Sequence, residues 1–189
     1  MRKIVSLFQR NYDGNRLVRN EVVPGAEWVL AGEGVATRKF DGTCCLLRDG
    51  VLYKRFDAKS GKIPPIGFEP AQDPDPVTGH WPGWVRIGAG PEDQYFREAL
   101  ANTQFLLNPA LTEYTCELCG PKVQGNPEHF ERHVLVLHGG EQLEDCPRTF
   151  DGIREFLTGR DIEGIVWHHP DGRMVKIKAK DYGIKRGSR

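Results

Sequence analysis

Short apolar runs separated by turn residues dominate the chain and favour strands over long helices. The runs at residues 43–47 (TCCLL) and 51–53 (VLY) flank the pair Asp49-Gly50. Because Asp-Gly readily takes the positive φ values of a type I′ turn, this pattern predicts a β-hairpin within residues 36–56.

The remaining elements follow from periodicity and from the placement of turn residues. Residues 57–91 are crowded with glycine and proline, which predicts an extended, mobile loop with at most one short strand, Trp84–Ile87. Helical spacing predicts helices over Glu92–Ala101 and Thr149–Leu157. Further predicted elements are strands at Glu27–Leu30, Leu111–Leu118 and His133–His138, one helical turn at Pro127–Arg132, and a second hairpin formed by Gly164–His169 and Arg173–Lys178.

Composition narrows the class of protein. The 189 residues carry 26 basic and 26 acidic side chains, so any affinity for nucleic acid must come from a local patch. No apolar run approaches the roughly 20 residues of a membrane span, and no signal-peptide pattern is present. The five cysteines are an odd number, which favours reduced thiols. We therefore expect a soluble, cytoplasmic monomer without a membrane partner, in which residues 1–189 form a single α+β domain with antiparallel sheets.

Four short features carry candidate chemistry: Lys39-Phe40-Asp41-Gly42, Glu117, Glu163-Gly164-Ile165-Val166 and Lys176-Ile177-Lys178. Residues two apart in a strand point to the same face, so Lys176 and Lys178 must project together, an arrangement suited to an anion. The two glutamates lie in apolar strands, where a cation or a ligand hydroxyl would relieve the cost of burial. A desolvated lysine among other cations becomes a nucleophile, and a nucleoside triphosphate is the matching electrophile.

These features have the order of the KxDG, strand glutamate, EGxV and KxK motifs, so the chain resembles the covalent nucleotidyltransferase superfamily of ATP-dependent RNA and DNA ligases and mRNA capping enzymes. More closely, it is similar to the small ATP-dependent RNA 5′-to-3′ ligase family found in vertebrates, bacteria and phages. The stretches that carry this similarity are SLFQRN, ATRKFDGTCC, YKRFDAKSGK, ELCGPKVQGNPE and DIEGIVWHHPDGRMVKIK. The resemblance implies one nucleotidyltransferase (adenylyltransferase) domain without a C-terminal OB fold, since only about eleven residues follow the KxK.

The resemblance also implies a reaction. Lys39 would attack the α-phosphate of ATP to give a lysyl-AMP intermediate, and Glu163 would bind the catalytic metal, Mg²⁺ or Mn²⁺. Lys176 and Lys178 would contact the α-phosphate. AMP would then pass to an RNA 5′-phosphate, and a 3′-hydroxyl would displace it and seal the strand, as RNA repair requires.

The resemblance implies further roles for residues that would bind the nucleotide. Asp41 would position the lysine or the metal, and Gly42 would let the backbone approach the nucleotide. Glu117 would bind the ribose hydroxyls. Arg55, preferred over its neighbour Lys54, would contact the ribose or the leaving phosphates.

Several alternatives stay open at this point. The chain could instead be a GTP-dependent capping-type guanylyltransferase, or a catalytically silent nucleotide- or RNA-binding module. Lys176 and Lys178 could be the solvated face of an edge strand. The base-stacking residue is not evident, although Val136 and His138 alternate onto one face and could flank the adenine.

The aromatic, cysteine and histidine residues could have structural roles instead of functional ones. Trp81 and Trp84 could stack on RNA bases or form a small satellite core. Cys116 and Cys119 tempt a zinc interpretation, but residues three apart in a strand face opposite sides, which favours core packing. The adjacent residues His168 and His169 also point to opposite sides, which favours one packed and one exposed histidine. The basic C-terminal residues could contact phosphates or be solvated.

Overall fold

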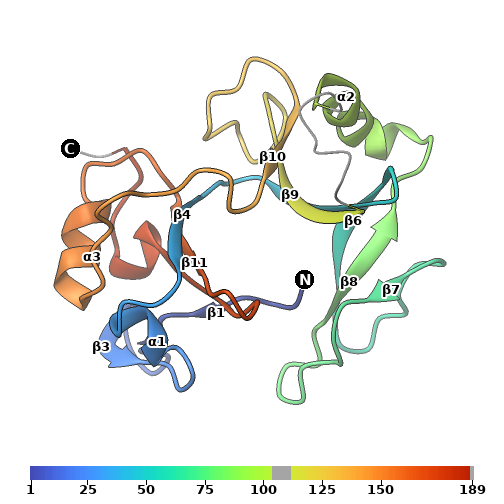
Figure 1. Cartoon of the computed structure of the whole chain (residues 1–189). Helices are drawn as coiled ribbons and strands as arrows, with labels where there is room; N and C mark the ends of the chain where they lie inside the picture. Colours follow the sequence, from blue (N-terminus) through green and yellow to red (C-terminus); the bar gives the residue numbers. More distant parts are fainter. Residues whose placement is uncertain (104–111, 188–189) are drawn as a thin grey trace. The chain divides into compact units, whose positions relative to one another are not determined.

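The computed structural model describes residues 1–103 and 112–187, which fall into two compact units (Figure 1). The first unit comprises Met1–Lys3 and Asp41–His138, and the second comprises Ile4–Phe40 and Gly139–Arg189. The chain therefore passes from one unit to the other inside the KxDG motif, between Phe40 and Asp41. Two compact units can belong to one domain, so the single-domain assignment stays a prediction.

The first unit is built on a six-stranded antiparallel sheet with the order β10-β9-β5-β6-β8-β7. Helix α2 (Gln94–Thr103), preceded by the 3₁₀ turn η1 (Pro91–Asp93), packs on one face of this sheet (Figure 1). Apolar residues from alternate strand positions and from α2 form the core between them: Cys45, Leu47, Leu52, Ala99, Cys116, Leu118, Val123 and Leu135. The strands are β5 (Thr43–Arg48), β6 (Val51–Ala58), β7 (Glu69–Pro70), β8 (Trp81–Arg86), β9 (Glu113–Cys119) and β10 (Val134–Leu137).

The second unit contains a four-stranded sheet with the order β1-β12-β11-β4, in which only β1 runs parallel to its neighbour. Its strands are β1 (Val5–Ser6), β4 (Val35–Lys39), β11 (Gly164–His168) and β12 (Met174–Lys178). The rest of the unit consists of the hairpin β2 (Phe8–Arg10) with β3 (Val18–Val22), helices α1 (Glu27–Leu30) and α3 (Phe150–Leu157), and the turn η3 (Ala179–Tyr182).

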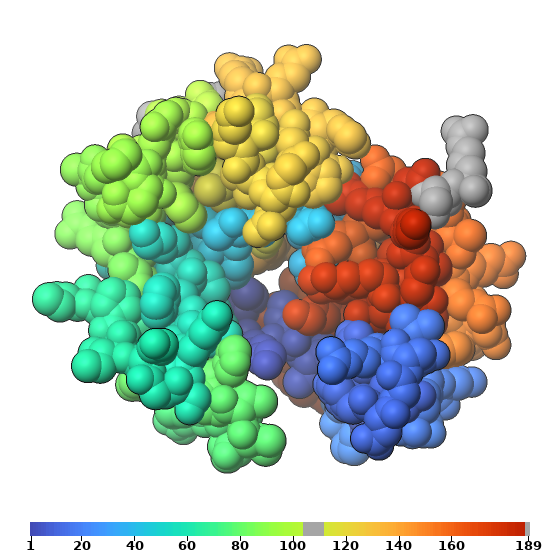
Figure 2. All heavy atoms as spheres, turned by 180° about the vertical axis from the view of Figure 1, so that it is seen from behind, coloured from blue at the N-terminus to red at the C-terminus, as the bar shows by residue number. Residues whose placement is uncertain are grey.

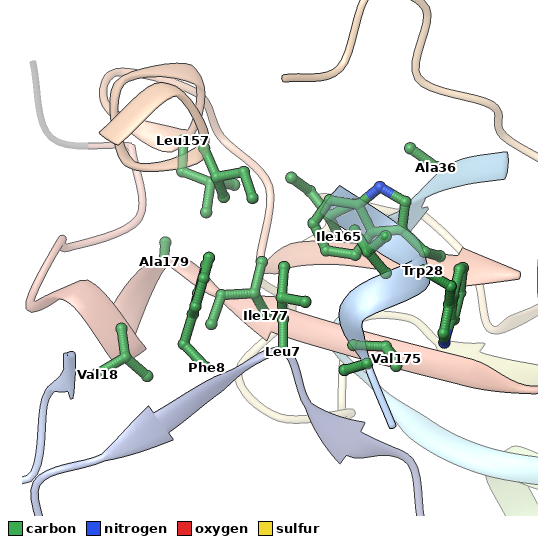
Figure 3. Close-up of a cluster of buried hydrophobic side chains, with 14 residues drawn as sticks. Leu7, Phe8, Val18, Trp28, Ala36, Leu157, Ile165, Val175, Ile177 and Ala179 are labelled. Atoms are coloured by element: carbon green, nitrogen blue, oxygen red, sulfur yellow. The ribbon is translucent and has the colours of Figure 1, made fainter. Parts of the chain in front are cut away.

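One face of the four-stranded sheet is apolar and the other is polar. Ile165 and Ile177 are fully buried on the apolar face, in one cluster with Leu157 of α3 and Phe8 of β2 (Figure 3). Trp167 of β11 is fully buried in the same cluster. Figure 2 shows early residues of this unit, in blue, beside its C-terminal residues, in red, and the ion pair Arg10–Asp181 at 2.5 Å joins these two segments. With one face buried, the alternate residues of β4, β11 and β12 are left to form the polar face.

Both predicted hairpins are confirmed. Strands β5 and β6 pair around Asp49 and Gly50, whose φ values of 50° and 75° match a type I′ turn. Strands β11 and β12 pair antiparallel through five residues each. The second predicted helix is confirmed as α3, and the Thr149 hydroxyl caps it by accepting a hydrogen bond from the Gly152 amide at 3.2 Å.

The other predicted elements agree in part. The helix predicted at Glu92–Ala101 exists but begins as a 3₁₀ turn and ends two residues later. Strands β9 and β10 match two predicted strands, while Leu111 lies outside the described residues. The prediction of at most one short strand within residues 57–91 was wrong, because this segment contains β7 and β8 as well as the end of β6. The strand predicted at Trp84–Ile87 overlaps β8, which begins at Trp81 and pairs with β6.

Two further local predictions were wrong. Residues Glu27–Leu30 form the short helix α1 instead of a strand, and the Ala31 amide closes the helical turn by donating to the Glu27 carbonyl at 3.1 Å. Residues Pro127–Arg132 contain turns in place of a helical turn, and the positive φ of His129, 57°, is incompatible with a right-handed helix. No helix in the described part of the chain is long and apolar enough to cross a membrane.

Candidate functional site

The predicted site residues fall into two groups, one in each unit. Lys39, Glu163, Lys176 and Lys178 belong to the second unit. Asp41, Gly42, Arg55 and Glu117 belong to the first.

The polar face of the four-stranded sheet carries three lysines. Gly164 of the central strand β11 pairs with Lys39 of β4 on one side and with Lys178 of β12 on the other. Residues directly opposite in a sheet point to the same face, so these two lysines flank a position without a side chain. Lys176 lies two residues from Lys178 and projects to the same face, between the buried residues Val175 and Ile177. The prediction that the two lysines of the KxK project together is confirmed.

Gly164 is required at this position by close backbone packing. A Cβ atom on Gly164 would lie 2.1 Å from the carbonyl oxygen of Ile177 and 2.8 Å from the Cα of Lys178. No side chain fits there. The glycine of the EGxV motif thus allows β4 and β12, the two neighbours of β11, to pack closely against it with their lysines on either side.

Glu163 joins two of the lysines. Its carboxylate accepts a hydrogen bond from Lys39 Nζ at 2.5 Å and another from Lys178 Nζ. Glu163 is buried, with 8% of its surface exposed. Burial alone would raise the pKa of Glu163, but the ammonium groups of Lys39 and Lys178 outweigh this effect and hold its pKa below the ordinary value. The carboxylate is therefore a fixed anion that orients both amines.

Lys176 is held among like charges. Burial, with smaller contributions from the neighbouring ammonium groups of Lys178 and Lys39, lowers its pKa from 10.5 to about 8. Like charges that repel each other inside a partly desolvated pocket favour an anionic ligand. The polar face of this sheet is chemically suited to bind phosphate groups beside a nucleophilic amine.

In the first unit, the face of the sheet opposite the α2 core carries the second group. Glu117 of β9 is directly paired with Cys44 of β5 and with Val136 of β10. Its Oε1 accepts a hydrogen bond from the Gly42 amide at 3.1 Å. A Cβ atom on Gly42 would lie 2.1 Å from the carbonyl oxygen of Leu118, so the glycine of the KxDG motif serves close packing against β9.

His138 is the principal partner of Glu117. Its Nε2 lies 2.8 Å from Glu117 Oε2, and its Nδ1 lies 2.9 Å from the hydroxyl of Thr115. Both partners come from β9, because His138 continues the register of β10 against β9 and its amide donates to the Thr115 carbonyl. The predicted placement of Val136 and His138 near Glu117 is confirmed, whereas their contact with adenine stays a prediction.

Arg55 and Lys54 point to opposite faces of the six-stranded sheet. The guanidinium of Arg55 lies 4.8 Å from the ring centroid of Trp84 and donates a hydrogen bond to the Met1 carbonyl at 2.6 Å. Lys54 instead forms a 2.5 Å ion pair with Asp93, which is 2% exposed and lies beside α2. The choice of Arg55 over Lys54 agrees with this geometry, since only Arg55 lies on the face that carries Glu117.

The remaining candidate residues form contacts within the first unit. The Asp41 amide donates to Glu128 Oε1 at 2.8 Å. Cys116 and Cys119 are buried free thiols, so the core interpretation agrees with the structure. Trp84 is buried as well, and Trp81 contacts Phe68, which favours the satellite core over an exposed stacking platform.

The two adjacent histidines and the basic C-terminal residues also form contacts within the protein. His168 contacts the Thr37 hydroxyl at 3.0 Å, and His169 lies between Glu33 and Asp171. In the tail, Arg186 pairs with Asp161 at 2.8 Å. Sequence reasoning missed Cys44 as a neighbour of Glu117, because only the register of β5 against β9 brings it there. It also missed Thr115, although strand alternation places Thr115 on the same face of β9 as Glu117.

Comparisons with known proteins point to one kind of enzyme. A protein-family model described as RNA ligase 1 matches residues 97–188. The chain is 26% identical over 223 residues to RNA ligase 1 of Rattus norvegicus, a match that covers 79% of this chain and 67% of the relative. Proteins of the same name from Mus musculus and Danio rerio are each 27% identical, with the same coverage. These matches support a relationship with an RNA ligase family.

Proposed function

We propose that this chain is an ATP-dependent RNA ligase that joins a 5′-phosphate to a 3′-hydroxyl through a lysyl-AMP intermediate. The similarity to proteins named RNA ligase 1 supports RNA ends as the substrate. The observation that carries the mechanism is the cluster on the polar face of the four-stranded sheet, where Glu163 holds both Lys39 and Lys178. A nucleophilic amine, its orienting acid and phosphate-binding cations are thereby assembled on adjacent strands.

The first step would transfer an adenylyl group. After Lys39 Nζ loses a proton, its lone pair attacks the α-phosphorus of ATP, the bond to the β-phosphate oxygen breaks, and pyrophosphate leaves. The ion pair with Glu163 orients the amine but opposes loss of its proton, so the incoming triphosphate must compete for the lysines. Lys176 and Lys178 would stabilise the charge that develops on the α-phosphate.

The next two steps would use the stored adenylate. An oxygen of the RNA 5′-phosphate attacks the phosphorus of lysyl-AMP and releases the amine. The RNA 3′-hydroxyl then attacks the activated 5′-phosphate, forms the phosphodiester and releases AMP. In the first unit, Glu117 would accept hydrogen bonds from the ribose hydroxyls, and Arg55 would contact ribose or phosphate, while Asp41 would help to position the lysine.

The described contacts of Glu163 bear on its proposed role as a metal ligand. A carboxylate is a donor of the kind that Mg²⁺ prefers, but both of its oxygens already bind ammonium groups. In this arrangement the residues do not fit a metal ion. Mg²⁺ or Mn²⁺ stays a proposed companion of the triphosphate, and no step above depends on it.

Intact-mass spectrometry after incubation with ATP and Mg²⁺ tests the proposal. The wild-type chain should gain one adenylyl group, and Lys39→Ala should gain none. Lys62→Ala, which removes an exposed lysine of the first unit, is the matched control and should gain the group like the wild type.

The same experiment decides between the alternatives. The protein is first treated with pyrophosphate to remove any AMP already attached. Labelling by GTP but not by ATP would favour a capping-type guanylyltransferase. Binding of ATP with no adduct would refute the ligase mechanism and favour a nucleotide-binding module.

A further inference from the structure

Three side chains of the first unit converge with an unusual combination of donor atoms. Cys44, Glu117 and His138 offer a sulfur, a carboxylate oxygen and an imidazole nitrogen that all lie within 4.8 Å of one another. Cys44 and Glu117 are directly paired on β5 and β9, so both side chains point to the same face. His138 reaches this face from the residue after β10. We propose that these three side chains bind one thiophilic divalent cation, with Zn²⁺ as the matching ion.

The donor set selects the class of metal. One thiolate, one imidazole and one carboxylate are typical of Zn²⁺ sites, whereas Mg²⁺ prefers oxygen donors only. Three protein ligands leave the fourth tetrahedral position for a water molecule. The two negative charges of the thiolate and the carboxylate balance the charge of the ion.

The surroundings hold the ligands in place. The Gly42 amide donates to Glu117 Oε1, which fixes one side of the carboxylate. The Thr115 hydroxyl lies 2.9 Å from His138 Nδ1 and can accept a hydrogen bond from Nδ1–H once the ion is bound, so that Nε2 presents its lone pair to the ion. A partner that orients the far nitrogen of a ligating histidine is a regular feature of metal sites.

Binding requires one proton to leave. Burial, together with the nearby Glu117 carboxylate, raises the pKa of the Cys44 thiol to about 12, so the free protein carries the thiol. The ion forms a bond to sulfur while the S–H bond breaks and its proton passes to solvent. Nε2 of His138 gives up its hydrogen bond to Glu117 as the imidazole proton moves to Nδ1.

The site also bears on the proposed activity. Glu117 is the residue assigned above to the ribose, so an ion that occupies it should compete with ATP; this consequence rests on the proposed function. The binding of the ion does not, because it requires neither ATP nor RNA.

Cobalt substitution tests the site directly. Titration of the whole chain with Co²⁺, without nucleotide, should produce a thiolate-to-cobalt charge-transfer band that saturates at one ion per chain and that Zn²⁺ abolishes. Cys44→Ser should lose the band, and Thr115→Val should weaken binding about 10- to 100-fold. Cys146→Ser, which removes a half-buried free thiol of the second unit, is the matched control and should keep it.

The absence of a band in the wild type would overturn the proposal, as would a band that survives Cys44→Ser. Thermal unfolding of each variant shows whether it is folded, and Thr115→Val keeps all three ligands if Cys44→Ser fails to fold. A chain that binds Co²⁺ but forms no adenylyl adduct refutes the proposed function and keeps the metal site. A chain that forms the adduct but binds no Co²⁺ refutes only the metal site.

Discussion

Replacing Lys176 by methionine should remove a pH dependence of stability that the crowded lysines create. Lys176 lies among the ammonium groups of Lys178 and Lys39, and burial is the main reason why its pKa falls from 10.5 to about 8. A lysine whose pKa is lower in the folded state keeps its proton there at a cost. Methionine has a similar length and no charge, so the substitution removes that cost while filling the same space.

The magnitude follows from the two pKa values. Near neutral pH the side chain is protonated in both states, and the folded state bears the cost of the buried charge. Above about pH 8 the folded state loses the proton while the unfolded chain still holds it, so stability rises with pH until about 10.5. Raising the pH to one unit above the folded pKa increases the free energy of unfolding by about 1.4 kcal/mol. Raising it from below the folded pKa to above the unfolded pKa increases the free energy of unfolding by about 3 kcal/mol in total.

Urea unfolding at about pH 7 and about pH 9 measures this effect. The free energy of unfolding of the wild type, relative to Lys176→Met, should rise by about 1.4 kcal/mol between the two conditions. Lys180→Met, which removes an exposed lysine of η3, is the matched control and should leave the pH dependence of the wild type in place. A difference between wild type and Lys176→Met that stays constant or falls with pH would refute the reasoning.

Two further predictions concern stability. Gly164→Ala should lower the free energy of unfolding by about 1–3 kcal/mol or more, because its Cβ would lie 2.1 Å from the Ile177 carbonyl oxygen. Gly88→Ala, whose nearest contact would be 3.5 Å, should cost far less. Urea unfolding of both variants checks this. Lys54→Met should destabilise the first unit by about 3–5 kcal/mol, because it leaves the buried Asp93 carboxylate without its cation. Adding Asp93→Asn should recover part of that loss in a thermal unfolding series. No recovery would contradict the stabilising role of this ion pair.

Local sequence signals predicted many of the strands and helices, and they predicted that Lys176 and Lys178 share one face of the site. The Asp49-Gly50 turn, the cap at Thr149 and the alternation of Lys176 with Lys178 all depend on residues a few positions apart. Such features can be read directly because turn conformation, helix capping and strand periodicity are set by neighbouring residues. The same local reasoning failed at Glu27–Leu30, because so short an apolar run is compatible with a strand and with the helical turn that the structure shows.

The sequence by itself determined which residues carry chemistry: a lysine before Asp-Gly, two acids in apolar strands and a closing pair of lysines. Only the tertiary structure decided which of them meet. Lys39 and Glu163 are 124 positions apart and are joined by the pairing of β4 with β11, and Cys44 and His138 reach Glu117 through the register of three strands. Such register is set by long-range burial of one sheet face, and a shift of one residue would turn every one of these side chains to the other side.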